Sequence, residues 1–378
     1  MYSDELPGDF DLKILRVISD LYPDVVGGLG LHAHEMSKLQ AKSGHQVTIF
    51  TSRINGNPIN ENVDGYQIFR FKNTFKLLGN SVSISLVRQL LKERNNYDII
   101  HAHSQHFFST NVCALIRKFG SPPLVITNHG LVSQTAPSWI QKIHTSTIGK
   151  WTFKAADGII CYTESEKGKL VELGIAPDKI FVIHNGIDTN KFIPAEKTET
   201  TGQILWIGRF TPGKGVDYLI EGFNLLLNKH PEVRLIMIGR GPKKKESLQK
   251  IQELGLSDKV IIKDFVENSE LTKVYQNSDV FVLPSLSEGI PRTILESMSS
   301  GIPVVCTDLP QLVDIVNGCG LLIPPMDSQA VSDAISKILS DVSLAHELGQ
   351  NGRKNLMSNF SWEDTVEQTL FFYGNLIK

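Results

Sequence analysis

The stretch Ser285-Leu-Ser-Glu-Gly-Ile-Pro-Arg-Thr-Ile-Leu-Glu-Ser-Met-Ser-Ser-Gly-Ile-Pro-Val-Val305 marks both ends of a short helix. Proline suits the first turn of a helix, where its missing N–H costs no hydrogen bond, so Pro291 predicts the start. Glycine is favoured just past the last residue, so Gly301 predicts the end, and the Ile302-Pro303 pair prevents continuation. The stretch therefore predicts a helix that leads directly into an apolar strand.

The apolar residues of this helix are expected to lie on one side of it. Ile294, Leu295 and Met298 recur at helical spacing and should face the core. Glu296 projects about 200° from Ile294, at about 100° per residue, which is away from the apolar side. A surface helix with solvated glutamates is the simpler alternative.

The residues just before the helix can bind a ligand through their backbone. Glu288 is followed by Gly289 and Ile290, whose N–H groups lie at the positive end of the helix dipole. Such groups bind anions or sugar oxygens. The stretch thus predicts a helix terminus that faces a ligand.

Length and composition indicate a two-domain globular protein. At 378 residues the chain exceeds what one hydrophobic core usually spans. Its 38 basic and 40 acidic residues nearly balance, which argues against nucleic acid as a partner. No apolar run approaches the ~20 residues that cross a bilayer, and the start of the chain lacks a signal-peptide pattern. Four cysteines without a C-x-x-C pair form no disulfide framework, so we expect a reduced, cytoplasmic protein.

Strand-like and helical runs alternate along nearly the whole chain, which predicts parallel sheets with helices on both faces. We expect an α/β protein with two tandem doubly wound, Rossmann-like domains facing a central cleft, with ligands at the carboxyl ends of the strands. Residues 1–193 form the expected first domain, 194–202 a polar linker, and 203–360 the second domain. The aromatic segment 361–378 is expected to pack back on the first domain as a helix. The expected strands are Lys13–Ile18, Gln46–Thr51, Asp98–His101, Leu124–Thr127, Gly158–Cys161, Ile180–Ile183, Ile204–Ile207, Arg234–Ile238, Val260–Ile262, Val280–Leu283 and Val304–Cys306, and the helical patterns of the first half are His32–Lys42, Phe107–Phe119 and Pro137–Lys154.

A glycine-containing turn follows the first strand of the first expected domain. Gly28, Gly30 and Ala33 match the dinucleotide pattern G-x-G-x-x-A, which brings phosphate to backbone N–H groups. The acid that holds a nicotinamide ribose is expected about 20 residues further on, where this chain carries Arg53 instead. The missing acid disfavours a nicotinamide site, whereas Arg53 can meet the 2′-phosphate of NADP, so NADP is disfavoured rather than excluded. A tight structural turn is the alternative.

The corresponding turn of the second expected domain, Gly208–Gly215, carries Arg209 and Lys214. Fixed cations beside a helix start are what a diphosphate leaving group requires. The stretch is not a complete P-loop, because Gly215 follows the lysine where Ser or Thr is needed. A solvated basic turn is the alternative.

Several histidines follow strands of the first half. His101 and His103 share one face of a strand, so a zinc site with them is conceivable, but the sequence shows no third ligand. A core or cleft histidine is the favoured interpretation for these two and for His129. Asp9-Phe10-Asp11 has metal-binding D-x-D spacing, yet it precedes the first strand and we regard it as coincidental. We expect no metal.

The stretch Tyr66–Arg94 is basic and apolar. It holds six cations against one acid, Glu93, and such a stretch can touch anionic lipid. A strand and helix with a solvated face is the more common origin of the pattern. The cations are Arg70, Lys72, Lys76, Arg88, Lys92 and Arg94, interleaved with Phe69, Phe71, Phe75, Leu77 and Leu78.

Together and in order, these motifs resemble the large family 4 of retaining glycosyltransferases, which have the two-domain GT-B architecture. The resemblance runs from about Lys13 to about Phe372. Its most specific element is the opening stretch, with its two glutamates and the closing Ser-Gly-Ile-Pro-Val-Val. The supporting elements are Gly27-Gly28, His129-Gly130, His184-Asn185-Gly186-Ile187-Asp188, Gly208-Arg209, Lys214-Gly215 and Asn277–Ser285.

The resemblance implies roles for the second half of the chain. Arg209 and Lys214 would neutralise the diphosphate of a sugar donor. Glu296 would hold the nucleoside ribose and Glu288 the sugar hydroxyls. The backbone of Gly289 to Arg292 would meet sugar or phosphate oxygens. Family members often have Phe or another Gly after Glu-Gly, whereas this chain reads Ile290-Pro291-Arg292, so this loop does not assign the sugar.

The resemblance also implies roles for the first half. His129 would lie near the anomeric carbon and Gly28 near the phosphates. His103 and Asn185 would lie on the acceptor or cleft side.

We therefore expect a retaining, metal-independent hexosyltransferase that uses a nucleoside diphosphate sugar of the UDP or GDP type and needs no cofactor. Its acceptor would be lipid-linked, a glycan or a small molecule, and peripheral contact with the cytoplasmic membrane face is left open. A glycoside hydrolase with Glu288 and Glu296 as its pair is one alternative, but such carboxyls lie about 5 Å apart, whereas eight helical residues span about 12 Å. A nucleotide-sugar epimerase and a non-catalytic nucleotide-sugar-binding module are the others.

Overall fold

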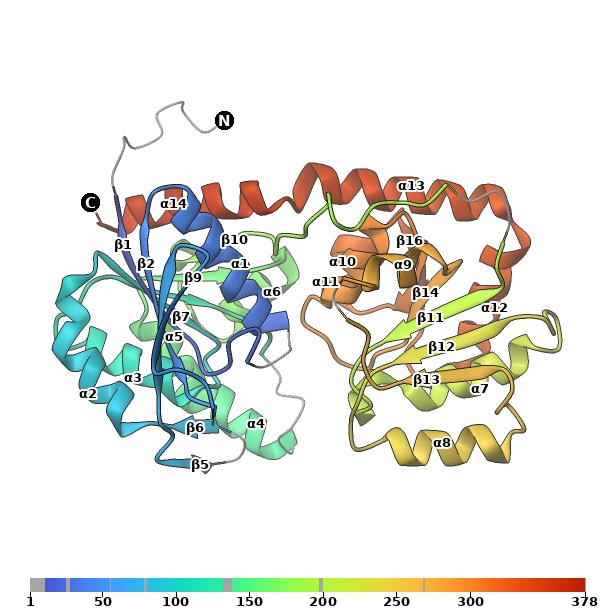
Figure 1. The fold of residues 1–378 in the computed structure, drawn as a ribbon, viewed down its shortest axis with the longest axis horizontal. Coiled ribbons are helices and arrows are strands. Elements are labelled where there is room, and N and C mark those ends of the chain that lie inside the picture. The colour runs from blue at the N-terminus through green and yellow to red at the C-terminus, as the bar shows by residue number, and fades with distance from the viewer. Residues whose placement is uncertain are drawn as a thin grey trace. The chain divides into compact units, whose positions relative to one another are not determined.

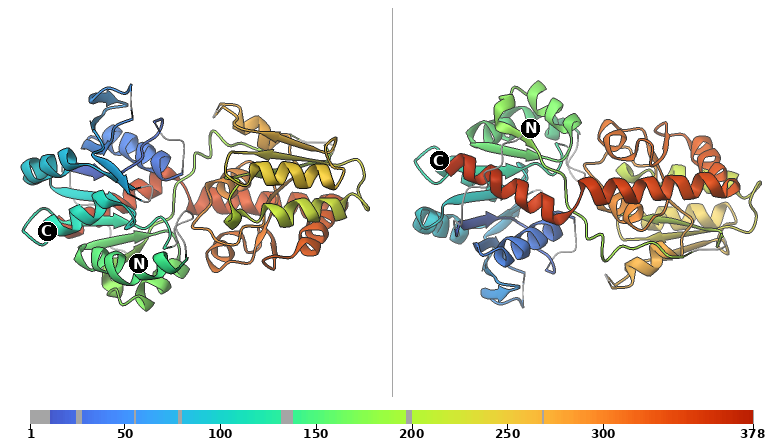
Figure 2. Two further views of the ribbon diagram at one scale, coloured as in Figure 1. Left: turned by 90° about the horizontal axis from the view of Figure 1, so that it is seen from below. Right: turned by 90° about the horizontal axis from the view of Figure 1, so that it is seen from above.

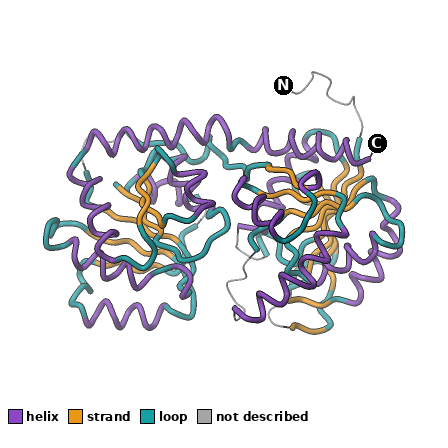
Figure 3. Tube along the Cα trace, turned by 180° about the vertical axis from the view of Figure 1, so that it is seen from behind, coloured by secondary structure: helices purple, strands orange, loops and turns teal. Residues whose placement is uncertain are grey.

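The computed structural model describes residues 11–24, 28–54, 56–77, 80–131, 138–196, 200–267 and 269–377. The chain forms two compact units: unit 1 comprises the residues up to Gly186 together with Trp362–Lys378, and unit 2 comprises Ile187–Ser361. Each unit is built around a sheet of mainly parallel strands with helices on both faces (Figures 1 and 2), as the alternating pattern predicts. Figure 3 shows the strands of each unit enclosed by helices.

Unit 1 contains an eight-stranded sheet of order β10-β9-β8-β7-β1-β2-β4-β3, in which β3 pairs antiparallel with β4 and all other neighbours are parallel. The strands are β1 (Lys13–Val17), β2 (Gln46–Ser52), β3 (Asn60–Val63), β4 (Tyr66–Phe71), β7 (Ile99–His103), β8 (Leu124–Thr127), β9 (Gly158–Cys161) and β10 (Ile180–Val182), beside a separate hairpin of β5 (Phe75–Leu77) and β6 (Asn80–Val82). The helices are α1 (Gly28–Lys42), α2 (Ile84–Glu93), η1 (Arg94–Asn96), α3 (Phe108–Arg117), α4 (Ser138–His144), η2 (Thr145–Gly149), α5 (Lys150–Ala155), α6 (Glu164–Glu172), η3 (Pro177–Lys179) and α14 (Trp362–Ile377).

Successive residues of the central strands pack into two different core layers. On β1, Ile14 belongs to one layer and Leu15 to the other, and Ile99 and Ile100 on β7 divide in the same way. This follows from the period of two along a strand. Because both faces are covered, the strands are almost continuously apolar, as buried parallel strands require.

Helix α14 completes the core of unit 1. It packs against α1, and Phe372 and Tyr373 are buried in the core layer that contains Ile14 and Ile99. A Cβ atom at Gly158 would lie 2.1 Å from the Phe372 ring, so glycine on β9 allows the close approach of this helix. The chain therefore returns to unit 1 to fill its core.

Unit 2 contains a six-stranded parallel sheet of order β13-β12-β11-β14-β15-β16 around a single core. The strands are β11 (Gln203–Ile207), β12 (Arg234–Ile238), β13 (Val260–Lys263), β14 (Val280–Leu283), β15 (Val304–Thr307) and β16 (Gly320–Ile323). The helices are η4 (Pro212–Lys214), α7 (Val216–Leu226), α8 (Lys244–Glu253), α9 (Leu271–Gln276), α10 (Arg292–Ser299), α11 (Pro310–Val316), α12 (Ser328–Ser340) and α13 (Val342–Asn359).

The strand order of each sheet identifies where a ligand should bind. In unit 2 the order reverses between β11 and β14, and in unit 1 between β1 and β7. Open α/β sheets bind ligands outside the carboxyl ends of the strands at such a switch point. The loops that follow these four strands are therefore the ones that position a site.

The expected strands agree with the structure to within two residues at each end, but five strands were not expected. The missed strands are β3 to β6 and β16. Asn60–Val63 is a polar edge strand, and Gly320–Ile323 is too short to show a period. The helix expected over Pro137–Lys154 is divided by the π-helical turn Thr145–Gly149, whose β-branched residues and glycine are poor helix formers.

The basic stretch is partly internal, so part of it cannot face lipid. The Arg70 guanidinium is buried and pairs with Asp24 at 2.7 Å and Glu61 at 2.5 Å. Phe69 and Phe71 pack on Phe50, with ring centroids 5.9 and 5.0 Å apart. Arg70, Phe69 and Phe71 are therefore not available for lipid contact, because β4 lies between β2 and β3.

Some quoted residues lie outside the described ranges. They are Asp9, Phe10, Gly27, Leu78, Pro137 and the linker residues Lys197, Thr198 and Glu199, and the side chain of Leu77 is likewise not described. Among the helices of the described residues, none combines the length and the apolar character needed to cross a membrane.

Candidate functional site

The predicted residues gather at the switch point of each sheet. In unit 2 the loop after β11 carries Arg209 and Lys214, and the loop after β14 carries Glu288 to Pro291, with Arg292 and Glu296 on α10. In unit 1, Gly28 begins α1, His103 ends β7, and His129 follows β8.

The two loops of unit 2 are in direct contact. Lys214 Nζ and Glu288 Oε1 form an ion pair at 2.5 Å, and their side chains are only 12% and 4% exposed. The backbone N–H of Leu286 donates to the carbonyl of Gly213 at 2.8 Å. At Gly215, where φ is +62°, a Cβ atom would lie 1.9 Å from the Pro284 carbonyl oxygen, so only glycine fits. This contact brings a predicted diphosphate cation to a predicted sugar anchor.

Glu296 is buried, although the helical spacing places it away from the apolar side. Its carboxylate accepts a hydrogen bond from the Tyr275 hydroxyl at 2.9 Å and another from Arg292 Nε at 3.1 Å. Burial raises the pKa of Glu296, and Arg292 and Tyr275 oppose that effect. The expected solvated side of α10 is thus covered, because Tyr275 on α9 packs over it.

The start of α10 has backbone groups available to a ligand. No side chain caps the helix at Pro291, the residue before Arg292. Gly289 and Ile290 are half-buried, and Gln311 Nε2 donates to the Glu288 carbonyl at 2.7 Å, which fixes the loop. Arg209 is exposed, and within the described ranges its guanidinium has no partner. The arrangement offers N–H groups and cations to an anion.

The two glutamates do not form an acid–base pair in this structure. Glu288 is paired with Lys214, whereas Glu296 is held by Arg292 and Tyr275. The partners are different, so no shared proton links the two carboxyl groups. The glycoside hydrolase alternative therefore has no support from the geometry.

In unit 1, both ring nitrogens of His129 lie within hydrogen-bonding distance of a partner. Its Nε2 lies 3.0 Å from His103 Nδ1, and its Nδ1 lies 3.1 Å from the Tyr162 hydroxyl. His103 is fully buried, whereas His129 is half-buried. A ligand proton can reach a ring nitrogen of His129 only if one of these hydrogen bonds breaks.

His32 joins this cluster from the first turns of α1, one turn after Gly28. Its ring lies 5.8 Å from that of His103 and 5.5 Å from that of His129, between centroids. Its Nδ1 lies 2.8 Å from Oδ1 of Asn185, which brings the second predicted acceptor-side residue to the same place. Gly28, His103, His129 and Asn185 are thus brought into one region of unit 1.

A buried cation lies behind the cluster. Arg16, on β1, is fully buried and donates to Ser37 Oγ, which lies at 2.5 Å, and to Gln40 Oε1, at 2.9 Å. Its guanidinium also lies 3.5 Å from His101 Nδ1, and His101 bonds to Thr127 and Tyr373 as well. Burial lowers the pKa of Arg16, yet it remains a cation because its ordinary value is so high.

The buried histidines are neutral at neutral pH. Burial lowers the pKa of His101, His103 and His129 well below the ordinary value, and the charge of Arg16 lowers that of His101 and His103 further. The zinc site considered for His101 and His103 finds no third ligand, because no three His, Cys, Asp or Glu side chains of the described residues are grouped to hold a metal.

Several residues of these clusters were missed by the sequence analysis. Tyr275 and Gln311 lie in short helices and carry no motif. His32 follows Gly28 by one turn of α1, so a helical projection from the glycine turn reveals it. Arg16 is a charged residue within the apolar strand Lys13–Val17. A buried charge needs hydrogen-bonding partners, so its position alone indicates a buried polar cluster.

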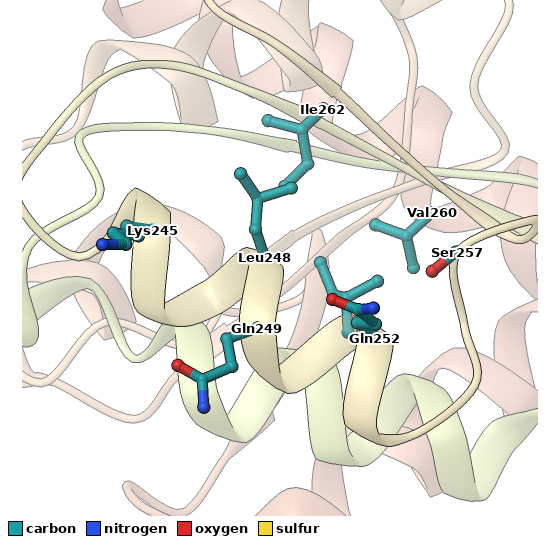
Figure 4. A pocket seen from close by; sticks show the side chains of 8 residues that line it. Lys245, Leu248, Gln249, Gln252, Ser257, Val260 and Ile262 are labelled. Atoms are coloured by element: carbon teal, nitrogen blue, oxygen red, sulfur yellow. The ribbon is translucent and has the colours of Figure 1, made fainter.

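A groove elsewhere in unit 2 does not belong to this site (Figure 4). It has a volume of about 510 Å³ and lies between α8 and β13, and none of the predicted donor residues lines it. Its lining consists of Lys245, Leu248, Gln249, Ile251, Gln252, Ser257, Val260 and Ile262.

Comparison with known proteins covers both units. The family Glycosyltransferase Family 4 matches residues 26–191, and Glycosyl transferases group 1 matches residues 188–355. An uncharacterized glycosyltransferase of Methanocaldococcus jannaschii is 24% identical over 96% of this chain and 98% of its own length. The GDP-mannose:cellobiosyl-diphosphopolyprenol alpha-mannosyltransferase of Xanthomonas campestris is 25% identical over 94% of each chain. Anabaena Alr3699/HepE, solved with UDP and glucose, matches 97% of this chain and 100% of its own at a TM-score of 0.80 and 20% identity. The expected family and fold class are confirmed.

The buried histidines predict that unit 1 loses stability in acid. On unfolding, each ring binds a proton near its ordinary pKa of about 6.5, whereas the folded ring, with its lowered pKa, stays neutral. The unfolded state therefore binds more protons below about pH 6.5, and the free energy of unfolding falls by about 1.4 kcal/mol per pH unit for each such histidine. Urea denaturation between pH 7.5 and 5.5, followed by hydrogen exchange in β7 and β8, measures this slope.

Two variants isolate the cluster. His103→Gln removes one titrating ring and should reduce the loss of stability between pH 7.5 and 5.5 by about 1.4 kcal/mol. His346→Gln, at an exposed residue of α13, is the control. Equal slopes for wild type and His103→Gln would show that His103 is not held neutral.

Proposed function

We propose that this chain, which belongs to the family 4 glycosyltransferases of GT-B architecture, transfers a hexose-type sugar from a nucleoside diphosphate donor to an acceptor. Transfer retains the anomeric configuration and requires no metal ion. The observation that carries the proposal is the meeting of Lys214, Glu288 and the uncapped start of α10 at the switch point of unit 2. That place is where a doubly wound sheet binds a nucleotide.

The donor's diphosphate is proposed to bind Lys214 and Arg209. Cleavage of the sugar–phosphate bond leaves negative charge on the diphosphate, and cations already in place stabilise it without reorganisation. Lys214 is held in position by Glu288 before any ligand arrives, and Arg209 is exposed and has no partner among the described residues. These two cations would supply the charge that a divalent ion supplies elsewhere.

The remaining donor contacts follow the family resemblance. Glu296 is proposed to hold the ribose hydroxyls, with Arg292 and Tyr275 keeping its carboxylate oriented. Glu288 is proposed to hold sugar hydroxyls, and the backbone of Gly289 to Arg292 would meet sugar or phosphate oxygens. The nucleotide is of the UDP or GDP type, which agrees with the UDP in the structure of HepE and the GDP-mannose in the name of the Xanthomonas campestris relative.

Unit 1 is proposed to contribute His129 beside the anomeric carbon, Gly28 beside the phosphates, and His103 and Asn185 on the acceptor side. Both ring nitrogens of His129 are occupied and the ring is neutral. We therefore assign His129 a positioning and packing role toward the sugar. Proton transfer through its ring is not part of the proposal.

The acceptor is proposed to be lipid-linked, and unit 1 to touch the membrane peripherally. On α2, Ile84, Arg88 and Leu91 follow at helical spacing and are all exposed, with Ile84 and Leu91 48% and 50% exposed. Lys92 is exposed at the end of this stripe. An exposed stripe that is both apolar and basic suits an anionic bilayer surface.

The β5–β6 hairpin continues this surface toward the predicted acceptor residues. Phe75 is 52% exposed between the exposed cations Lys72 and Lys76. The hairpin is fixed to the start of α2, because Ile84 N donates to Thr74 Oγ1 at 3.2 Å. Figure 1 shows β5, β6 and α4 along one border of unit 1. Trp139 on α4 is 65% exposed.

The hairpin also contacts the loop after β7, the strand that ends at His103. Asn80 on β6 accepts a hydrogen bond from Phe108 N at 3.0 Å and donates to the carbonyl of His106. A lipid held by the hairpin and α2 would therefore have its head group near the acceptor-side residues. The name of the Xanthomonas campestris relative, which includes a diphosphopolyprenol, supports an acceptor of this class.

Nucleotide binding is the first test of the proposal. A ligand that binds only the native state raises the free energy of unfolding, by about 2.7 kcal/mol at a ligand concentration of 100 times its dissociation constant. The midpoint of thermal unfolding rises with it. We expect UDP or GDP to raise the midpoint and ADP to do so least, measured by differential scanning fluorimetry. The Glu296→Gln variant should lose the shift, and the absence of a shift with all three nucleotides would contradict the donor class.

The variant Lys214→Ala tests the diphosphate contact. Loss of one preorganised charge donor lowers kcat on the order of 100-fold or more, and this should hold in the presence of EDTA. Lys250→Ala is the matched control, because Lys250 also forms a 2.5 Å ion pair, with Glu221, elsewhere in unit 2. Near wild-type turnover in Lys214→Ala would remove Lys214 from the mechanism, and loss of wild-type activity with EDTA would contradict metal independence.

Membrane contact is tested by sedimentation with vesicles that contain phosphatidylglycerol at low salt. Each surface lysine contributes about 1 kcal/mol to attraction by anionic lipid, so Lys72→Glu combined with Lys76→Glu should weaken binding by about 30-fold or more. Lys337→Glu combined with Lys354→Glu changes net charge equally on exposed sites of unit 2 and should have little effect. A wild-type chain that stays in the supernatant would contradict a membrane-bound acceptor.

A further inference from the structure

The hydroxyl of Tyr162 contacts the predicted site through His129. Tyr162 follows β9 and is buried, with its hydroxyl 3.1 Å from His129 Nδ1. From His129 the contact continues through Nε2 to His103 Nδ1 at 3.0 Å. The three side chains form one line of hydrogen bonds from Tyr162 to the end of β7.

The direction of this line follows from counting donors and acceptors. A neutral imidazole carries one N–H, so His129 donates on one side and accepts on the other. If Tyr162 donates to His129, then His129 donates to His103, and within the described ranges only His103 Nε2–H is left without a partner. If His103 instead donates to His129 and His129 donates to Tyr162, both the Tyr162 O–H and His103 Nε2 are left without a hydrogen-bond partner.

The first direction leaves fewer buried polar groups unsatisfied, and buried polar groups are almost always satisfied. Burial also raises the pKa of the Tyr162 hydroxyl, which keeps its proton available for donation. His32 packs its ring against Tyr162, His129 and His103 and so restricts how the three rings turn.

We infer that Tyr162 is a positioning residue that holds His129 as its Nε2–H tautomer. His129 then donates to His103 Nδ1, so His103 carries its own proton on Nε2, at the carboxyl end of β7. His103 Nε2 is buried and unpartnered among the described residues. An uncharged oxygen that displaces what covers this atom, such as a hydroxyl of the acceptor or of the sugar, would meet a fixed, neutral donor there. The inference rests on the proposed function where it connects this donor to turnover. The assignment of the tautomers stands apart from turnover.

The tautomers are read from ring nitrogen signals in the full chain labelled with ¹⁵N-histidine. We expect wild-type His129 and His103 both to carry the proton on Nε2. In Tyr162→Phe the two directions leave equal numbers of unsatisfied groups, so the signals of both histidines should shift toward a mixture of tautomers. With a donor and acceptor in hand, kcat should fall about tenfold or more while KM for the nucleotide sugar stays within about twofold.

Tyr66→Phe is the matched control. Tyr66 is also buried in unit 1, and its hydroxyl lies 2.6 Å from a histidine nitrogen, Nδ1 of His34. It should lower stability like Tyr162→Phe but leave kcat and the signals of His129 and His103 unchanged. An Nδ1–H tautomer of His129 in the wild type, or unchanged signals in Tyr162→Phe, would overturn the inference.

Two kinetic outcomes complete the test. An equal fall of kcat in both variants would reduce Tyr162 to a structural role. Tautomer signals as expected in a chain that transfers no sugar would contradict the proposed function and leave the assignment of Tyr162 intact.

Discussion

A parallel strand cannot pair with the next one until the chain has crossed back over the sheet, and this constraint arranges the whole molecule. Every strand-to-helix loop of a unit must lie at the carboxyl edge of its sheet, and the loops on either side of the switch point diverge to opposite faces. In unit 2 this brings Lys214 to Glu288 across 74 residues of sequence. In unit 1 it brings the end of β7 to the loop after β8, and with it His103 to His129.

The sequence predicted those features that repeat or that sit at element ends. Apolar runs such as Leu124–Thr127 are unmistakable because both of their faces are buried, and Pro291 and Gly301 bounded α10 correctly. Contacts between elements could not be predicted from the sequence. Nothing local indicates that Tyr275 covers Glu296 or that β4 is internal and buries Arg70, because both facts depend on which helix or strand packs alongside.

The two sites differ in how they manage charge. Unit 2 leaves its cations near the surface, where Lys214 is compensated by Glu288 and Arg209 by solvent. Unit 1 encloses Arg16 with neutral oxygens and a histidine nitrogen, and no carboxylate faces it among its bonded partners. A buried positive charge without a counter-ion makes protonation of the neighbouring histidines unfavourable. The hydrogen-bonded rings are therefore neutral dipoles with fixed directions, which suits recognition of hydroxyl groups better than exchange of protons.

The return of the chain to unit 1 through α14 has a consequence for biosynthesis. Unit 2 is one continuous segment, so it can fold as soon as it has left the ribosome. Unit 1 cannot, because Phe372 and Tyr373 belong to its core and are made only after all of unit 2. Until then Gly158 lacks its contact with Phe372, and His101 lacks its hydrogen bond with Tyr373. The half of the protein that is translated first is thus the half that matures last.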